Sequence, residues 1–184
     1  MPLSLAGGIA RGPVIAALAV LLAVAVALEV ARARSPAVAR VFTRTVGALL
    51  REHEGPAQNM RWTGATWLIG VSLVAVGLLP RADAVAVTWA VTVGDASAAL
   101  VGMTLGGRLV PRRSDKSVEG SMACFVATLA GAYGLAGLSL SLALLVSAAA
   151  TLAEWPRSVI DDNVRVGAAT AAVLVLASMF MTGK

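Results

Sequence analysis

Six apolar stretches, each close to the length of a membrane-crossing helix, constrain this chain more than any other feature. They run over residues 13–30, 62–79, 84–105, 120–135, 138–155 and 164–181. A helix needs about 20 mainly apolar residues to cross the hydrocarbon core of a bilayer. Hydrophobic residues make up 58% of the 184 positions, more than a water-soluble domain of this size carries. We therefore predict an all-α, polytopic integral membrane protein in which residues 1–184 form a single membrane-embedded domain.

The basic residues are divided unevenly between the two sides of these spans. Twelve of the 15 Lys and Arg residues fall in the connections after the first, third and fifth stretches, if Arg165 at the very start of the sixth stretch is counted with them. Because positive residues are enriched on the cytoplasmic side, we expect these connections to face the cytoplasm, in a prokaryotic plasma membrane. The same charges lie in short loops without interleaved aromatic residues, which argues against nucleic-acid binding. Cys124 is the one cysteine, so an intrachain disulfide and a thiolate metal cluster are excluded.

Residues 38–51 differ from the spans because their apolar and basic side chains separate onto two helical faces. Phe42 and Leu49 fall near one face, and Arg44 lies towards the other. This pattern predicts an amphipathic helix that rests in the membrane interface. It would bring His53 to the cytoplasmic surface, where a lone histidine is more often incidental than catalytic.

Asp95 stands in the middle of the third apolar stretch. A carboxylate at this depth is costly, and such residues usually face a polar cavity, a partner or an ion. Small residues recur every four positions from Gly94 to Gly106, and a second small-residue stripe runs from Gly120 to Gly134. Both stripes allow close helix packing. Packing does not explain Asp95, which we predict to be functional.

The connection that follows ends in Lys-Ser-Val-Glu-Gly, residues 116–120, at a predicted helix start. Backbone N–H groups at a helix N-terminus attract anions, and Lys116 and Arg108 add positive charge, so we predict a phosphate site here. Residues 102–109 approach a P-loop, but Arg108 and Leu109 stand where Lys and Ser or Thr are required, and no strand precedes them. We therefore reject that motif and keep the phosphate site.

Acidic residues gather on the same predicted side of the membrane. Glu154 ends the fifth stretch, and Asp161, Asp162 and Asn163 precede the sixth. Carboxylate and amide oxygens are the hard ligands that Mg²⁺ prefers. Mg²⁺ beside a phosphate site indicates phosphoryl or nucleotidyl transfer.

Several segments, in this order, resemble one family of membrane enzymes. GDASAALVGMTLGG, KSVEGSMACF and ATLAEWPRSVIDDN, with REHE and TGATW upstream, are similar to the CTP-dependent lipid-alcohol kinases: dolichol kinase, phytol kinase and yeast-type diacylglycerol kinase. The resemblance runs from about Ser35 to the C-terminus. It implies an enzyme that transfers the terminal phosphate of CTP to a lipid hydroxyl with a divalent cation. Family members usually begin with a helix carrying Arg-Lys and then His, and no such pattern precedes Pro13, so we expect the chain to lack that helix.

The resemblance also implies roles for individual residues. The expected catalytic residues are Asp95, Lys116, Glu119 and Asp162. The expected Mg²⁺ ligands are Asp95, Glu154, Asp161 and Asp162. The expected nucleotide contacts are Gly94, Arg108, Lys116, Ser117, Gly120 and Asn163. The lipid alcohol would enter between helices at headgroup depth, and the sequence leaves open which carboxylate takes its proton and whether the protein is a homo-oligomer.

Two other functions stay open. Phosphatidate cytidylyltransferases share an aspartate followed by KxxEG and also use CTP, but their C-terminal signature of Lys, Asp and His-Gly is absent from about the last thirty residues here. A small transporter could also carry an intramembrane aspartate and small-residue helix faces, although inverted repeats are not evident.

Overall fold

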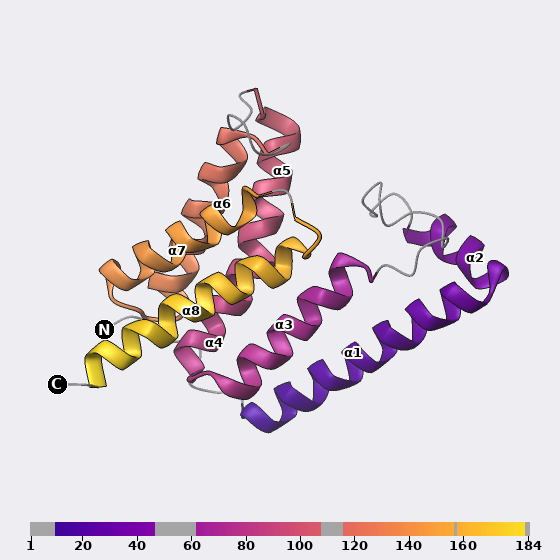
Figure 1. Ribbon diagram of the computed structural model, residues 1–184, viewed down its shortest axis with the longest axis horizontal. Coiled ribbons are helices and arrows are strands. Elements are labelled where there is room, and N and C mark those ends of the chain that lie inside the picture. Colours follow the sequence, from indigo (N-terminus) through magenta and orange to yellow (C-terminus); the bar gives the residue numbers. More distant parts are fainter. Residues whose placement is uncertain (1–9, 47–61, 108–115, 157, 183–184) are drawn as a thin grey trace.

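The computed structural model describes residues 10–46, 62–107, 116–156 and 158–182, and the elements in these ranges are all helices (Figure 1). The all-α prediction is confirmed. The elements are α1 (Arg11–Arg34), α2 (Pro36–Val46), α3 (Gly64–Leu78), α4 (Arg81–Trp89), the π-helical η4 (Ala90–Gly94), α5 (Asp95–Leu105), α6 (Val118–Ala130), the π-helical η5 (Gly131–Leu135), α7 (Leu140–Glu154) and α8 (Asp162–Thr182).

Four of these helical segments are long and apolar enough to cross a membrane. They are Arg11–Arg34, Arg81–Leu105, Val118–Leu135 and Asp162–Phe180, where the second and third combine an α-helix with its π-helical continuation. Gly64–Leu78 and Leu140–Glu154 are apolar but shorter. Each predicted apolar stretch coincides with one of these six helical segments. Their length and composition fit an integral membrane protein.

Local sequence explains where the helices end. Pro36 occupies the first position of α2 and Pro80 immediately precedes α4, and both residues interrupt the helix before them because proline disfavours helical conformation in the preceding residue. The fourth and fifth predicted stretches leave only residues 136 and 137 between them. The structure locates the turn at Gly137, whose φ of 71° suits glycine. The Leu138 N–H then bonds back to the Ala132 carbonyl at 3.1 Å.

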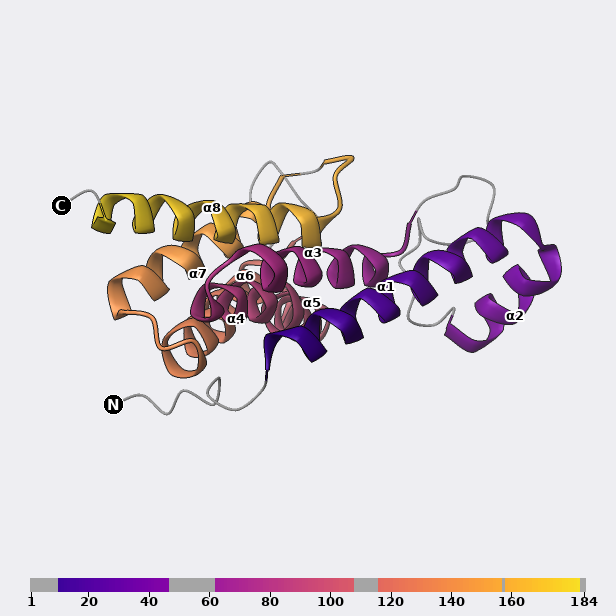
Figure 2. The same cartoon turned by 90° about the horizontal axis from the view of Figure 1, so that it is seen from below.

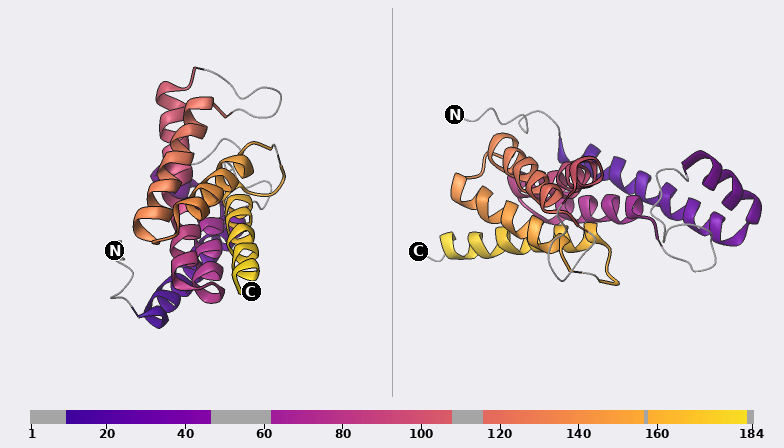
Figure 3. Two further views of the ribbon diagram at one scale, coloured as in Figure 1. Left: turned by 90° about the vertical axis from the view of Figure 1, so that its left-hand side faces the viewer. Right: turned by 90° about the horizontal axis from the view of Figure 1, so that it is seen from above.

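The helices pack as successive antiparallel neighbours. α1 packs on α3, α3 also contacts α4 and α8, α5 packs on α6, and α6 and α8 flank α7 (Figures 1 and 2). The buried core consists mainly of Ala and Val with few larger residues such as Leu174, so the helix backbones lie close together. α1 is the outlying helix, because only 6% of its span is buried. Figure 3 shows α1 and α2 extending away from the remaining helices.

An amphipathic helix is present near the predicted position as α2, and the last residues of the prediction, 47–51, lie outside the described residues, as does His53. α1 extends beyond the predicted end of the first span and carries a buried ion pair there, Glu29 with Arg32 at 2.6 Å. The Arg32 guanidinium lies 4.8 Å from the ring centroid of Phe42 on α2. This contact fixes α2 against the end of α1, a link that sequence reasoning did not predict.

Candidate functional site

Hydrogen bonds and an ion pair join five helix termini at one end of the bundle, which we call the polar end. The end of α1 meets the start of α3, because Glu29 Oε1 accepts the Thr63 N–H at 3.0 Å. The start of α3 meets α8 through Asn163 Nδ2, which donates to the Gly64 carbonyl at 3.1 Å. The end of α7 meets α6, because Trp155 Nε1 donates to Ser121 Oγ at 3.1 Å.

The start of α6 is built as an N-cap and lies directly against α5. Ser117 Oγ accepts the Gly120 N–H at 3.0 Å, which satisfies one of the free donors of the first turn. A Cβ on Gly120 would lie 2.7 Å from the Ala98 carbonyl oxygen and 3.3 Å from the Gly102 Cα. The two predicted small-residue stripes therefore pack against each other, and only glycine fits at their closest point.

This close approach leaves a cavity of 160 Å³ between α5, α6 and the end of α7. Its polar lining comes from Lys116, Ser117, Ser121 and Glu154, and the remainder comes from Ala98, Ala99, Gly102, Met103 and Gly120. The cavity adjoins the N-terminus of α6, where backbone N–H groups and the helix dipole favour an anion. A cationic and an anionic side chain thus face the same small space.

Lys116 interacts with several carboxylates at the polar end. Its Nζ lies 3.1 Å from Asp162 Oδ2. Burial by itself would lower the pKa of Lys116, but the negative charges of Glu154, Asp162 and Asp95 outweigh it and raise that pKa above its ordinary value. Lys116 is therefore held fully protonated at neutral pH, as a phosphate-binding lysine must be.

Glu154 is the most unusual side chain at the polar end. It is only 2% exposed, and neither of its buried carboxylate oxygens accepts an N–H or O–H hydrogen bond among the described residues; the thiol of Cys124, a weak donor, is its hydrogen-bonding neighbour. Leaving a buried charged group without such partners costs several kcal/mol unless a counter-charge or ligand compensates. Lys116 supplies part of that compensation from across the cavity. The remaining oxygen capacity is available to a cation or to a hydroxyl proton.

Asp95 follows directly after the π-helical stretch η4 and begins α5. It is half-buried, and its charge acts on both Lys116 and Glu154. π-helical turns are rare and often occur at functional sites. The structure thus brings Asp95, Lys116, Glu154 and Asp162 into one electrostatic cluster from four different helices or their flanks.

In the Asp161–Asn163 segment, Asp161 has a structural role, whereas Asp162 pairs with Lys116. Asp161 Oδ1 accepts the backbone N–H of Asn163 at 2.9 Å and its Nδ2 at 3.0 Å, so this carboxylate caps the start of α8. Asn163 is 3% exposed, and its Oδ1 has no partner among the described residues. Arg165 bonds both to Asp162 and to the Pro156 carbonyl, which ties the α7–α8 connection to α8.

The predicted four-carboxylate metal site is not gathered at one point. Among the described residues, no group of three or more Asp, Glu, His or Cys side chains is placed to hold a metal ion. Asp161 is occupied as a cap, and Asp162 is bonded to Lys116 and Arg165. The unpartnered Glu154 oxygens nevertheless fit a hard cation, because Mg²⁺ is usually held by one or two carboxylates together with substrate phosphates.

Other predicted site residues lie outside this arrangement. Gly94 is buried against Thr128 and Cys124 of α6, where a Cβ would lie 2.6 Å from Thr128 Oγ1, and it does not line the cavity. Glu119 is half-buried in the first turn of α6 and is also not part of the lining. Arg108 lies outside the described residues. Ser121 and Trp155 were missed; the one available signal for Ser121 was its position one turn after Ser117.

Comparisons with known proteins add no assignment to this geometry. No family model matches the chain, and neither a curated protein nor a solved structure is significantly similar to it.

Proposed function

We propose that this protein is an integral membrane enzyme that transfers the terminal phosphoryl group of CTP to a lipid alcohol. The observation that carries the proposal is Glu154, a buried carboxylate that accepts no N–H or O–H hydrogen bond among the described residues and that lines a cavity together with Lys116 and the first turn of α6. Such a cavity offers positive charge for phosphate oxygens and a negative group for a cation or a proton. The resemblance of the GDA, KSxEG and C-terminal acidic segments to lipid-alcohol kinases supplies the choice of CTP and lipid.

In this proposal the reaction needs positioning and charge neutralisation more than covalent help from the protein. Lys116 and the first-turn N–H groups of α6 bind phosphate oxygens of the nucleotide. The lipid hydroxyl oxygen bonds to the terminal phosphorus, the bond from that phosphorus to the bridging oxygen breaks, and CDP leaves with the bond's electrons. Asp95 or Glu154 accepts the hydroxyl proton. Mg²⁺, held by Glu154 and Asp95 with the phosphates, would neutralise developing negative charge.

The topology forms part of the same proposal. Six helical segments, α1, α3, α4–η4–α5, α6–η5, α7 and α8, would cross the membrane, with the polar end in the cytoplasm and α2 in the interface. Ser158 and Ser139 are exposed and lie in connections at opposite ends of α7. In a Cys124→Ala background, a membrane-impermeant thiol reagent should label Ser139→Cys in intact cells and label Ser158→Cys only after lysis. The reverse pattern would invert the topology.

The test of activity uses purified protein in detergent with labelled CTP, Mg²⁺ and a panel of lipid alcohols. We expect phosphorylated lipid and CDP in equal amounts, and we expect Glu154→Gln to abolish both. CDP-lipid together with pyrophosphate would instead identify a phosphatidate cytidylyltransferase. If neither product forms with any acceptor, the kinase proposal fails and a transporter becomes the leading alternative.

A further inference from the structure

Residues 32–46, which we call the α1–α2 corner, carry four arginines and no acidic residue (Figure 1). Arg32 is buried, whereas Arg34, Arg40 and Arg44 are exposed. Among the described residues, none of these three exposed guanidinium groups is paired with a carboxylate. Their positive charge is therefore not neutralised within the described part of the chain.

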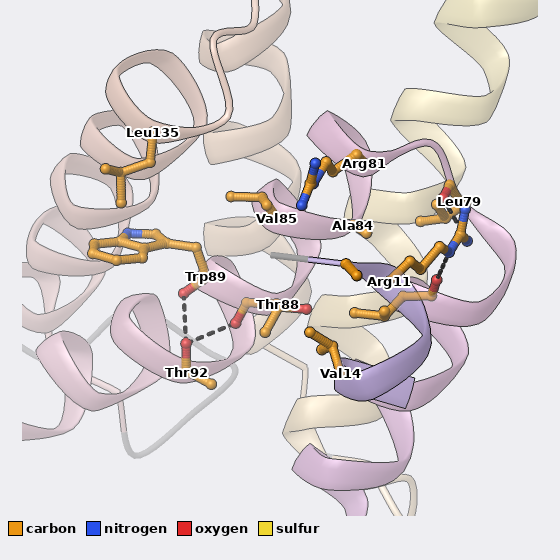
Figure 4. A pocket seen from close by; sticks show the side chains of 12 residues that line it. Arg11, Val14, Leu79, Arg81, Ala84, Val85, Thr88, Trp89, Thr92 and Leu135 are labelled. Atoms are coloured by element: carbon orange, nitrogen blue, oxygen red, sulfur yellow. Dashed lines mark hydrogen bonds between the residues drawn. The ribbon is translucent and has the colours of Figure 1, made fainter. Parts of the chain in front are cut away.

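The arginine at the other end of α1 is used differently. Arg11 donates from Nε to the Val76 carbonyl at 2.6 Å and from Nη2 to the Leu79 carbonyl at 2.9 Å, which joins α1 to the end of α3 (Figure 4). It borders a cavity of 560 Å³ between α1, α3, α4 with η4, and η5, whose lining is mainly apolar and includes Thr88. At this end of the bundle, opposite to the polar end, the guanidinium binds protein and has a structural role.

α2 adds an apolar face to the basic corner. Val38, Val41 and Phe42 fall on one side of this helix at the angular spacing of an α-helix, and Arg40 and Arg44 fall on the other side. Val41 is 61% exposed, so the described helices do not cover the apolar face there. A helix with arginines on one face and apolar residues on the other lies in the plane of a bilayer interface, and anionic lipids strengthen its binding.

A series of contacts joins α2 to the polar end. The Phe42 ring lies 4.8 Å from the Arg32 guanidinium, and Arg32 pairs with Glu29 at 2.6 Å. Glu29 accepts the N–H of Thr63 at the start of α3, and Asn163 joins the start of α3 to the start of α8. Because a buried ion pair depends on good packing around it, α2 must stay against α1 for Arg32 and Glu29 to remain covered.

We propose that the α1–α2 corner binds anionic phospholipid headgroups and that this binding holds α2 against α1. The exposed arginines bind headgroup phosphate oxygens, and the apolar face of α2 enters the boundary with the acyl chains. A lipid is favoured over an acidic protein because only Ser35 separates α2 from the membrane-length helix α1, which keeps α2 at the bilayer surface. The inference rests on the membrane placement proposed above and is independent of the kinase reaction.

The test places a fluorophore on Val41→Cys in full-length Cys124→Ala protein, reconstituted in nanodiscs of equimolar phosphatidylcholine and phosphatidylglycerol. Bromine on the acyl chains of one lipid or the other quenches the fluorophore on contact. We expect brominated phosphatidylglycerol to quench about fivefold more strongly, because one arginine at an anionic surface enriches anionic lipid by about that factor. Leu145→Cys, on α7 and 59% exposed, is the matched control probe and should be quenched equally by both lipids.

Two pairs of substitutions identify the source of the preference. Arg40→Gln with Arg44→Gln should reduce the preference for phosphatidylglycerol severalfold, whereas Arg40→Lys with Arg44→Lys should retain it because the charge is kept. High salt should weaken the preference as well, since exposed charges are screened. Equal quenching by the two lipids, an undiminished preference in the Gln protein, or no quenching by either lipid at Val41→Cys would each overturn the lipid assignment.

Melting temperatures in detergent with either lipid added test whether the bound lipid holds α2 in place. Phosphatidylglycerol should stabilise the wild type more than phosphatidylcholine does, because a ligand that binds only the folded state raises its stability. Phe42→Leu keeps the apolar face but removes the ring contact with Arg32, so it should retain the lipid preference and lose the extra stabilisation. Equal effects of the two lipids on the wild type, or full stabilisation of Phe42→Leu, would overturn this part of the inference.

These results are distinguishable from the outcome for kinase activity, because none of the measurements uses CTP. If phosphatidylglycerol is preferred at Val41→Cys but no lipid alcohol is phosphorylated, the lipid surface stands and the kinase function fails. If lipid alcohols are phosphorylated but the two brominated lipids quench equally, the kinase function stands and the lipid surface fails.

Discussion

The two ends of the bundle differ in how their charged side chains are bonded and in the polarity of the adjoining cavity. At the polar end, Lys116 is paired with Asp162 at 3.1 Å and is influenced by two further carboxylates. One of these, Glu154, lines the adjoining cavity of 160 Å³ and accepts no N–H or O–H hydrogen bond within the described part of the chain. At the opposite end, Arg11 donates hydrogen bonds to backbone carbonyls, and the lining of the adjoining 560 Å³ cavity is mainly apolar. One end retains buried oxygens of Glu154 and Asn163 that lack N–H or O–H partners among the described residues, while the other bonds most of its polar groups internally, apart from Thr88 Oγ1, and its lining is mainly apolar.

One continuous helix contributes to both ends, and its π-helical stretch separates them. Asp95 follows Thr88 by seven residues, a spacing that would place both on nearly the same face of a regular α-helix. The wider turns of η4, Ala90–Gly94, lie between them and change the direction of the residues that follow. Thr88 consequently lines the apolar cavity, whereas Asp95 acts on Lys116 and Glu154. A local irregularity thus allows one helix to serve two chemically different sites.

The largest expected effect comes from removing the charge of Asp95, in the middle of that helix. Asp95→Asn should lower phosphoryl transfer by about 10²- to 10³-fold, the range seen when one preorganised electrostatic group is lost. Thermal stability in detergent should change little, because Lys116 keeps Asp162 at 3.1 Å. Asp83→Asn, near the start of α4, is the matched control and should leave turnover unchanged.

A parallel loss of stability and turnover in Asp95→Asn would assign Asp95 a structural role as a partner of Lys116. Melting temperatures measured with and without Mg²⁺ and CTP test separately whether Asp95 binds the metal ion. Wild type should be stabilised by the two ligands together and Asp95→Asn much less, whereas equal stabilisation would transfer the Mg²⁺ role to Glu154.

The second prediction concerns the close contact that shapes the smaller cavity. Gly120→Ala would place a methyl 2.7 Å from the Ala98 carbonyl, so α5 and α6 must separate. We expect a cost of about 1–3 kcal/mol, the usual range for overpacking, seen as a lower melting temperature and reduced activity. Gly134→Ala, on the same helical segment but with nothing within 4 Å, should melt like wild type. Equal melting of the two variants would show that the α5–α6 contact is looser than described.

The smallest expected effect is the pH dependence of Lys116. Since its pKa is raised in the folded protein, the stability it contributes is fully present below the ordinary lysine pKa of about 10.4 and is lost as pH rises through the raised value. Wild type should therefore melt above Lys116→Met by roughly 2–4 °C near pH 8, equivalent to about 1 kcal/mol. That difference should disappear in strongly alkaline buffer. A difference that stays constant through the alkaline range would show that charge is not its source.

The sequence alone determined where the helices lie and which charged residues are unusual in or beside them. The six apolar stretches, the interruptions at Pro36 and Pro80, and the turn near Gly137 depend on hydropathy and backbone preference within a few residues, so they can be predicted locally. Asp95 and Lys116 could be recognised for the same reason. Each is a charged residue in or beside an apolar segment, and the cost of such a charge does not depend on knowing its partners.

Only the tertiary structure decided which polar groups are satisfied and which are not. Asp161 and Glu154 are both acidic residues at helix ends, yet Asp161 caps α8, while Glu154 is buried and receives no N–H or O–H hydrogen bond from the residues that the structure describes. The hydrogen bond from Thr63 to Glu29, 34 residues apart, and the apolar cavity beside α1 likewise had no local signal. Such outcomes depend on the rotation and depth of each helix relative to its neighbours. Contacts such as Gly120 against Ala98 fix that rotation and depth, and they join residues far apart in the chain.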